Sequence, residues 1–282
     1  MLSGLQGSRR CCGVLGRPIA HSLSPALHRA AYAALGLDWE YAAHDVGEDD
    51  LAAFLHGLGE EWRGLSLTMP LKRAVMPLLD EVSLTAQRAG GANTVVIDDG
   101  RLVGDNTDVP GIVAALRERL GGAPTSALVL GGGATAASVL LALSDLGCSH
   151  ATLLVREPAR AAETVEAVHR HPTPPLLTVA RLDDLDRRVV DADLLASTIP
   201  AAAQTQGVLS AAAQVGAVFE VVYDPWPTPL AETALAAGLP LVDGLDLLAH
   251  QAVLQVELMA GGTVPAELLR QAGRAELARR AG

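Results

Sequence analysis

Apolar positions along the chain follow two spacings, one typical of strands and one typical of helices. Compact apolar or alternating runs predict strands in the first third, at residues 11–16, 39–46, 64–68 and 93–97. Residues 25–36 and 49–58 instead carry apolar side chains at helical spacing, with glycines where the helices are expected to stop. This repeated order of strand, turn and helix predicts an α/β fold.

The same pattern continues after a connecting segment. Residues 108–122 predict a helix that leads out of the first domain, and residues 121–126 are typical of a linker. Beyond it, strands are expected at residues 126–130, 151–155, 191–198, 215–223 and 239–244. Helices are expected at residues 137–147, 228–238 and 245–261. A chain of 282 residues has room for two domains of about 150 residues, and the second has the order of a doubly wound sheet.

A glycine-rich turn connects the first strand of this second domain to its helix. Gly131, Gly133 and Ala136 match the spacing G-x-G-x-x-A, with Gly132 and Ala134 in the same turn. In this setting glycines let the backbone approach a pyrophosphate, and the helix N-terminus supplies amide donors and a positive dipole. The sequence therefore predicts a Rossmann-type dinucleotide site.

The next strand ends where such a fold reads the ribose of its cofactor, and an acidic residue there usually selects NAD. Here Arg156 follows the strand and Arg160 lies one helical turn further on, so two guanidinium groups could clamp a 2′-phosphate. Glu157 lies between them and would repel a phosphate if it pointed inward. The pattern favours NADP over NAD, and its alternative is an ordinary solvated helix start.

Composition narrows the classes of partner. Half of the residues are hydrophobic, yet no uncharged apolar run approaches the roughly 20 residues that cross a bilayer. The first ten residues lack the apolar core of a signal peptide, so we expect a cytoplasmic protein without a membrane partner. A net charge of −11 and 3% aromatic residues argue against nucleic acid as a partner. Three cysteines without metal-ligand spacing predict neither a disulfide framework nor a metal site.

One lysine stands out among the charged residues. Of the 21 basic side chains, 20 are arginine and only Lys72 is lysine. It follows a short alternating apolar segment in GLSLTMPLK, whereas chance would place a surviving lysine on a solvated helix face. A compact ammonium with a tunable pKa can transfer a proton, which a guanidinium cannot. Lys72 is therefore the first candidate for catalysis.

Other polar residues lie beside expected helix starts. Ser24, directly before a proline, is an expected N-cap, and with Ser22 it offers two hydroxyls suited to a carboxylate. Asp108 is a second expected N-cap, on the helix between the domains. Gln251 and Gln255 lie one helical turn apart, and on spacing alone they fit a solvated stripe of the last apolar helix.

Together these motifs resemble the shikimate dehydrogenase family, whose members reduce 3-dehydroshikimate to shikimate with NADPH. The resemblance runs nearly end to end through GxPIAHSLSP, SLTMPLK, GGANT, GDNTD, GGGATA, STIP, YDPWPTPL and DGLDLLAHQA. It implies an N-terminal α/β substrate domain at residues 1–108 and 245–282, to which the C-terminal helices return. A Rossmann-type, doubly wound NADP-binding domain is then expected at residues 109–244.

The family implies a role for each matching residue. The substrate carboxylate would be bound by Ser22, Ser24 and Tyr223. The ring hydroxyls would be held by Ser66, Thr68, Lys72, Asn93, Asp108 and Gln251. The NADP-binding residues would be Gly131, Gly132, Gly133, Ala134 and Ala136 at the pyrophosphate, Arg156 and Arg160 at the 2′-phosphate, and Thr198, Gly244 and Leu247. Lys72 would act as the acid/base and Asp108 as its partner, because negative charge grows on the ketone oxygen as hydride reaches carbon.

The chain departs from the family pattern at several of its positions. Ser66 replaces a more common asparagine, and Leu247 replaces a usual methionine. Val155 and Glu157 replace the asparagine and threonine that flank the NADP-binding arginine, and Glu220 replaces an aspartate.

Two other functions stay open at this point. The same fold and the same lysine and aspartate also serve quinate, so an NAD-dependent quinate or quinate/shikimate dehydrogenase is the nearest alternative. A non-catalytic, nucleotide-sensing homologue is the second, although a sensor has no need for Lys72 and Asp108. The resemblance is compatible with a monomer or a homodimer that takes a small-molecule substrate.

Overall fold

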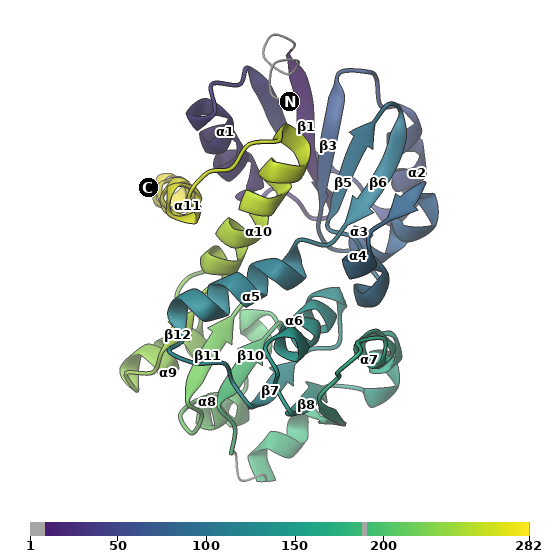
Figure 1. Cartoon of the computed structure of the whole chain (residues 1–282). Coiled ribbons are helices and arrows are strands. Elements are labelled where there is room, and N and C mark those ends of the chain that lie inside the picture. The colour runs from purple at the N-terminus through teal and green to yellow at the C-terminus, as the bar shows by residue number, and fades with distance from the viewer. Residues whose placement is uncertain (1–8, 188–190, 282) are drawn as a thin grey trace. The chain divides into compact units, whose positions relative to one another are not determined.

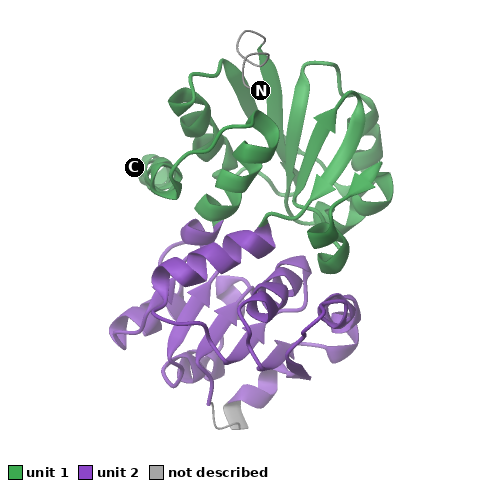
Figure 2. Cartoon of the chain, viewed as in Figure 1, with its two compact units in different colours: residues 1–107, 248–282 green, residues 108–247 purple. Residues whose placement is uncertain are grey.

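The computed structural model describes residues 9–187 and 191–281, and these form two compact units. Unit 1 comprises residues 1–107 and 248–282, and unit 2 comprises residues 108–247 (Figure 2). These limits lie one and three residues from the expected domain boundaries. The first eight residues, where no signal peptide is expected, lie outside the described part of the chain.

Unit 1 is built around a six-stranded sheet in the order β2-β1-β3-β5-β6-β4 (Figure 1). Its strands are β1 (Arg10–Gly16), β2 (Trp39–Asp45), β3 (Trp62–Leu67), β4 (Glu81–Val82), β5 (Thr94–Asp98) and β6 (Arg101–Asp105). Its helices are α1 (Ser24–Ala34), α2 (Glu48–His56), α3 (Leu71–Ala74), η1 (Met76–Leu78), α4 (Leu84–Ala89), α10 (Gly244–Ala260) and α11 (Ala266–Ala281). Helix α10 starts in unit 2 and continues into unit 1.

The apolar pattern of each strand in unit 1 follows from how deeply that strand is buried. The central strand β1 is buried from Cys12 to Gly16 and reads as a continuous apolar run, whereas the outer strand β2 alternates buried and exposed residues. Leu15 and Leu65 lie in a core that Leu51 of α2 and Leu71 of α3 complete from the same side. Strand β5 runs antiparallel to both of its neighbours, while the other pairings are parallel.

Unit 2 contains a fully parallel six-stranded sheet in the order β12-β11-β10-β7-β8-β9. Its strands are β7 (Ser126–Leu130), β8 (His150–Val155), β9 (Leu176–Arg181), β10 (Leu194–Ser197), β11 (Ala217–Glu220) and β12 (Leu241–Val242). Its helices are α5 (Asp108–Arg119), α6 (Ala134–Asp145), η2 (Pro158–Ala161), α7 (Ala162–His169), η3 (Leu182–Arg187), η4 (Ala201–Ala203), α8 (Gln206–Ala212) and α9 (Pro229–Ala236).

The order of strands in unit 2 confirms the Rossmann-type, doubly wound prediction. Successive strands are added in one direction from β7 to β9 and in the other direction from β10 to β12. The boundary between β7 and β10 is therefore the switch point at which such folds bind ligands. Helix α6 is buried nearly all round, and this accounts for its uniformly apolar sequence. An ion pair of 2.6 Å between Arg119 of α5 and the buried Asp246 ties the connecting helix to the start of α10.

Several elements differ from the sequence prediction. Eight of the described strands and α-helices were not predicted, namely β4, β6, β9, α3, α4, α7, α8 and α11. Of these, β4, α3 and α4 have only two, four and six residues, too few for a readable period. Helix α6 begins at Ala134, three residues before the expected start, and β11 ends at Glu220 rather than at residue 223. No helix among the described residues is long and apolar enough to cross a membrane.

Candidate active site

The predicted substrate-binding residues of unit 1 gather at one edge of its sheet. The carboxyl ends of β1, β3 and β6 meet at this edge with the amino end of β5, because β5 runs the opposite way. Ser22 and Ser24 follow β1, Lys72 follows β3, and Asn93 directly precedes β5. Residues distant in sequence are therefore brought to one edge by strand direction alone (Figure 1).

The two serines differ from the sequence prediction in one respect. Leu23, not Ser24, is the N-cap of α1, and Ser24 is the first helical residue. The hydroxyl of Ser22 accepts a hydrogen bond of 3.3 Å from the backbone N–H of Ser24, so Ser22 satisfies one of the unpaired donors at this helix start. Arg280 of α11 donates to the carbonyl oxygens of His21 and Ser22 at 2.8 and 2.9 Å, which fixes the turn.

The end of β3 places Ser66, Thr68 and Lys72 in succession. The Thr68 N–H donates to the Leu15 carbonyl at 2.9 Å, and the fully buried Leu71 anchors α3 against the core. The Lys72 carbonyl accepts from Ala92 N–H at 2.8 Å, and a Cβ at Gly91 would approach that carbonyl to 3.1 Å. The backbone that carries the half-buried Lys72 side chain is thus held by the segment that leads to Asn93.

Asn93 and Gln251 form a buried amide cluster with Thr107. The Asn93 Nδ2 donates to Thr107 Oγ1 at 2.9 Å and to Gln251 Oε1 at 3.2 Å. Its Oδ1 accepts from the Thr107 N–H at 2.8 Å. Such a network fixes which amide atoms face the sheet edge, and this property suits the recognition of a substrate with several hydroxyls.

The glutamines of α10 correct a second expectation. The solvated stripe suggested by their spacing is wrong, because Gln251 and Gln255 are only 6% and 1% exposed. Gln255 accepts a hydrogen bond of 2.8 Å from the hydroxyl of Ser66, which in turn accepts one of 2.6 Å from Tyr41. Neither Gln255 nor Tyr41 belonged to the predicted site, and only the i, i+4 spacing from Gln251 pointed to the glutamine.

Tyr41 is held by aromatic packing. Its ring stacks on His28 with the centroids 4.0 Å apart, and the His28 Nδ1 donates to the Ser24 carbonyl at 2.9 Å. Burial lowers the pKa of His28 to about 4, so this imidazole is neutral at pH 7. Burial also raises the pKa of Tyr41 far above its ordinary value, so the hydroxyl keeps its proton and can donate it in a hydrogen bond.

The glycine turn of unit 2 has the geometry of a phosphate cradle. Gly131 directly follows β7 with φ +105°, a conformation that favours glycine. A Cβ at this position would lie 2.3 Å from Thr198 Oγ1, so glycine also keeps the space between the ends of β7 and β10 open. Gly133 caps α6 with open space around its Cα, and Thr164 holds the turn through a bond of 2.7 Å to the Gly132 carbonyl. These residues fit a dinucleotide pyrophosphate.

The two arginines of the expected clamp are exposed beside this turn. Arg156 directly follows β8, and Arg160 lies in η2. Arg160 pairs with Glu157 at 3.4 Å, with side chains 84% and 59% exposed. An ion pair this exposed contributes about 0–1 kcal/mol, so a phosphate can displace it.

The remaining predicted residues of unit 2 lie at element ends. The Thr198 hydroxyl donates to the Leu130 carbonyl at 2.7 Å, which ties β10 to the glycine turn. Gly244 starts α10, and a Cβ there would lie 2.2 Å from the Val221 carbonyl. Leu247 is buried in the first turn of the same helix, Tyr223 is half-buried after β11, and Ala136 is fully buried in α6. The buried Asp108 is the first residue of α5 rather than the N-cap residue before it.

Glu220, which replaces an aspartate of the family pattern, is a buried acid. It is fully buried at the end of β11 and accepts from Val222 N–H at 3.1 Å, from Thr228 Oγ1 at 3.2 Å and from Gln204 Nε2. Burial raises the pKa of Glu220 to about 7, although these donors act in the opposite direction. Its contacts join β11 to α9 and η4, so its role is structural.

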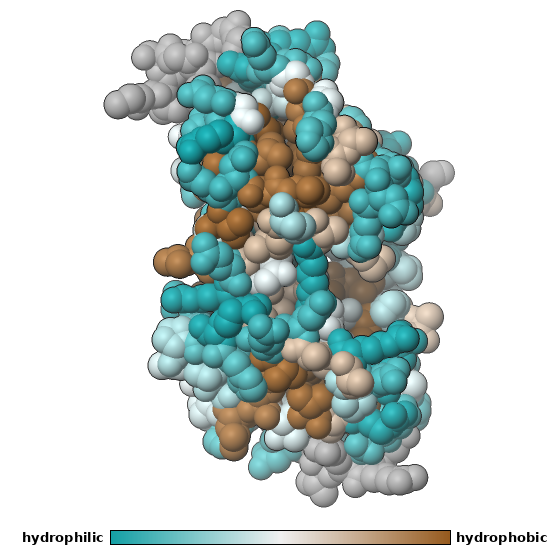
Figure 3. Space-filling model, turned by 90° about the vertical axis from the view of Figure 1, so that its right-hand side faces the viewer, coloured by the Kyte–Doolittle hydropathy of each residue, from teal (hydrophilic) through white to brown (hydrophobic). Residues whose placement is uncertain are grey.

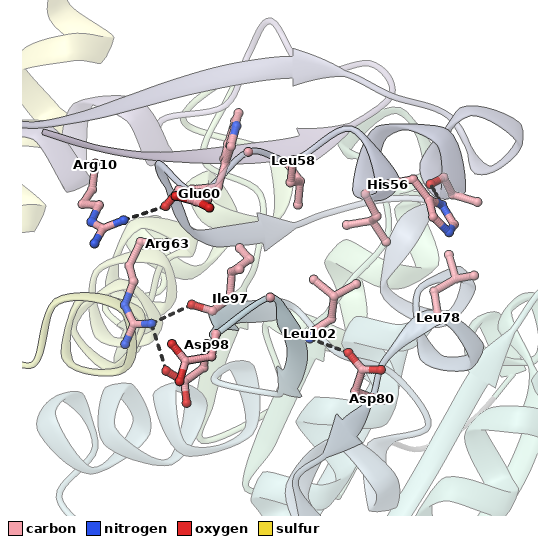
Figure 4. Close-up of a pocket in the computed structure, with 16 residues that line it drawn as sticks. Arg10, His56, Leu58, Glu60, Arg63, Leu78, Asp80, Ile97, Asp98 and Leu102 are labelled. Carbon is pink, nitrogen blue, oxygen red and sulfur yellow. Dashed lines mark hydrogen bonds and ion pairs between the residues drawn. The ribbon is translucent and has the colours of Figure 1, made fainter.

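One cavity among the described residues does not coincide with this site. It has a volume of about 950 Å³ and lies in unit 1 beside α2 and the β5-β6 hairpin (Figure 4). Apolar side chains such as Leu58 and Leu102 line it, and Arg63 closes one end by donating to the Ile97 carbonyl at 2.6 Å. Figure 3 shows hydrophobic residues gathered between hydrophilic margins in the same part of the chain. Among the described residues, no cluster of side chains could hold a metal ion.

Comparison with known proteins identifies the family. Residues 14–95 match the family described as the shikimate dehydrogenase substrate binding domain. The chain is 35% identical over 288 residues to a shikimate dehydrogenase (NADP(+)) of Synechococcus sp., with 97% of this chain and 96% of that protein covered.

Solved structures agree with this comparison. A shikimate 5-dehydrogenase from Thermus thermophilus, in complex with NADP(H) and shikimate, is 34% identical with a TM-score of 0.79, covering 94% of this chain and 99% of that one. A quinate dehydrogenase from Corynebacterium glutamicum, in complex with NAD, is 28% identical with a TM-score of 0.86, covering 95% and 100%. The arrangement of the sheet edge, the glycine turn and the nearly full-length similarity lead to one conclusion: the chain belongs to the shikimate dehydrogenase family.

Proposed function

We propose that this protein is an NADP-dependent shikimate dehydrogenase that reversibly reduces 3-dehydroshikimate to shikimate. The observation that carries the proposal is the placement of Lys72, the only lysine of the chain, at the sheet edge to which Ser22, Asn93 and Gln251 also belong. These side chains offer the donors and acceptors that a carboxylated ring with several hydroxyls needs. Unit 1 is then the substrate domain and unit 2 the NADP-binding domain.

Two groups of residues bind the two polar parts of the substrate, its carboxylate and its ring hydroxyls. Ser22 and Ser24 bind the carboxylate at the start of α1, where hydroxyls and the helix dipole favour an anion, and Tyr223 assists. The ring hydroxyls are held by Ser66, Thr68, Asn93 and Gln251. The buried amide cluster of Asn93 and Gln251 supports this role, because its orientation is set before a substrate arrives.

Lys72 carries the acid/base chemistry. Bound NADPH supplies a hydride to the carbonyl carbon of the substrate. The Lys72 ammonium gives its proton to the carbonyl oxygen on which negative charge develops, and in the reverse direction the amine accepts a proton from the hydroxyl. Asp108 is its partner in this role.

The cofactor site lies on unit 2. Gly131, Gly132, Gly133 and Ala134 form the pyrophosphate turn, with Ala136 buried behind it. Arg156 and Arg160 bind the 2′-phosphate of NADP, which distinguishes it from NAD. Thr198, Gly244 and Leu247 lie on the nicotinamide side.

We further propose that the protein acts in the cytoplasm, as a monomer or homodimer, and that its net charge of −11 excludes nucleic acid as a partner.

The experiment that tests this function is a fourfold assay. The purified protein is offered shikimate or quinate with NADP⁺ or NAD⁺, and reduction of the cofactor is followed by its absorbance. We expect the highest kcat/KM with shikimate and NADP⁺. Replacing Lys72→Arg keeps the positive charge but removes a transferable proton, so kcat should fall by about 10²- to 10⁴-fold while NADP⁺ still binds.

The exposed Arg101→Lys variant is the matched control, since it exchanges the same two residue types away from the sheet edge. It should retain wild-type kcat. Undiminished activity of Lys72→Arg would contradict the catalytic role of Lys72. Higher kcat/KM with quinate and NAD⁺ would instead support the function of the Corynebacterium relative.

A further inference from the structure

Ser66 is the midpoint of a continuous hydrogen-bonded line in unit 1. The Tyr41 hydroxyl donates to Ser66 Oγ at 2.6 Å, and Ser66 donates to Gln255 Oε1 at 2.8 Å. Gln255 Nε2 donates in turn to the Asn93 carbonyl at 3.1 Å and to Thr94 Oγ1 at 3.0 Å. The Thr94 hydroxyl continues the line to Asn93 Oδ1 at 2.9 Å. The line therefore ends at the amide that also binds Gln251.

The direction of every hydrogen bond in this line follows from one residue. On one side, the Gln255 amide faces two acceptors, the Asn93 carbonyl oxygen and Thr94 Oγ1. Its NH₂ group must lie on that side, so its Oε1 must face Ser66. Ser66 has a single proton, and Oε1 takes it. Tyr41 must then be the donor to Ser66, in agreement with a burial-raised pKa that keeps its hydroxyl protonated. One lone pair of Ser66 Oγ is left for a ligand.

We propose that Gln255 is a positioning residue that makes Ser66 a hydrogen-bond acceptor for a ring hydroxyl of the substrate. This inference rests on the proposed function, because it concerns the same sheet edge. An asparagine side chain, which the family has more often at position 66, can donate through its NH₂ group. Ser66, with its only proton committed to Gln255, selects a substrate that presents an O–H donor at that point.

Burial makes this line rigid. Ser66 is 4% exposed, and Gln255 and Tyr41 are each 1% exposed. His28 stacks on the Tyr41 ring, and Tyr32 packs edge-on against His28, so the tyrosine hydroxyl has little freedom to turn. A buried polar network with fixed donors orients a binding group before the ligand arrives, and this lowers the entropic cost of binding.

The test compares Gln255→Met with the exposed Gln271→Met of α11. Methionine has a similar length and volume but no amide, so Ser66 can turn its proton toward the substrate and Asn93 loses a donor. For Gln255→Met we expect the KM for shikimate to rise about tenfold, the effect of losing one buried hydrogen bond, with the KM for NADP⁺ within about twofold of wild type. Gln271→Met should leave both constants unchanged.

A double-mutant cycle separates positioning from a general loss of structure. If Gln255 acts on the substrate through Ser66, Gln255→Met should raise the shikimate KM much less in a Ser66→Ala background than in wild type. Purely additive effects, with a lowered Tm, would mean that Gln255 only stabilises the fold, and they would overturn the inference.

Tyr41→Phe is the second variant if Gln255→Met fails to fold. It keeps the ring that stacks on His28 and removes the hydroxyl that donates to Ser66 and also contacts the Ser24 side chain, so the shikimate KM should rise about threefold. Suppose that the wild type oxidises shikimate, and that Gln255→Met and Tyr41→Phe both keep its KM for shikimate. That result overturns this inference but leaves the proposed function intact. A wild-type protein inactive with shikimate overturns the proposed function and this inference together.

Discussion

At the scale of single residues, two arginines illustrate what a position along the chain can and cannot predict. Arg156 and Arg160 were predicted as a phosphate clamp because of their positions after β8. Glu157 was the argument against it, and its effect depends on where its carboxylate points. The ion pair between Glu157 and Arg160 turns that carboxylate toward an arginine, at an exposed site where such a pair is weak.

The clamp predicts a selective loss in Arg156→Ala. Removing a guanidinium that binds a 2′-phosphate should raise the KM for NADP⁺ about tenfold or more, the usual effect of losing a charged hydrogen bond, while the KM for NAD⁺ stays unchanged. Steady-state assays with both cofactors measure this. Arg170→Ala, which removes the exposed C-cap arginine of α7 that pairs with Glu166, is the control. An unaltered preference for NADP⁺ in Arg156→Ala would show that the clamp argument is wrong.

Among the elements, β11 depends on a buried acid at its end. Glu220 accepts hydrogen bonds from groups of η4, α9 and the segment after β11, so it fixes the ends of three elements. Its pKa of about 7 lies above the value of 4.5 expected for an unfolded chain, because burial disfavours the carboxylate. The folded protein therefore binds this proton more tightly than the unfolded chain.

This difference predicts a pH-dependent stability. The contribution of Glu220 is present in full below about pH 4.5 and is lost as the pH rises through about 7. Between pH 8 and pH 5, the free energy of unfolding of the wild type should increase by about 2–3 kcal/mol relative to Glu220→Gln. Urea unfolding of both proteins across this range measures the difference. Glu232→Gln, at an exposed position of α9, should show no such slope relative to wild type.

At the scale of the whole molecule, the two units have separate cores. Unit 2 is one uninterrupted segment of the chain, residues 108–247, and its core includes Leu130, Leu154 and Leu195 from three adjacent strands. A contiguous segment with its own core can fold alone. Unit 1 is made of two segments, so its core requires residues from both ends of the chain.

We therefore predict that a fragment of residues 108–247 folds and binds NADP⁺. It should unfold cooperatively, and NADP⁺ at a hundredfold excess over its Kd should stabilise it by about 2.7 kcal/mol, seen as a rise in Tm of several degrees. Gly131→Ala is the control, because its Cβ would lie 2.3 Å from Thr198 Oγ1. A folded fragment without a Tm shift would contradict the assignment of NADP binding to unit 2.

Local sequence patterns alone predict the α/β class and the glycine turn, and they single out Lys72 as a candidate for catalysis. These features depend on local patterns: apolar spacing, glycines between a strand and a helix, and one residue type used once. They also predict many of the strands and helices, although not β4, β6 and β9 or the C-terminal helix α11.

The surroundings of Ser66 depend instead on how distant segments of the chain pack together. Tyr41, Ser66 and Gln255 are separated by 25 and 189 residues, and their hydrogen bonds exist because β2, β3 and α10 pack together. The spacing of Gln251 and Gln255 suggested a solvated stripe, since periodicity shows which residues share a face but not what covers it. Burial and donor direction are properties of the packed chain, and they turned a glutamine with no predicted role into the residue that orients Ser66.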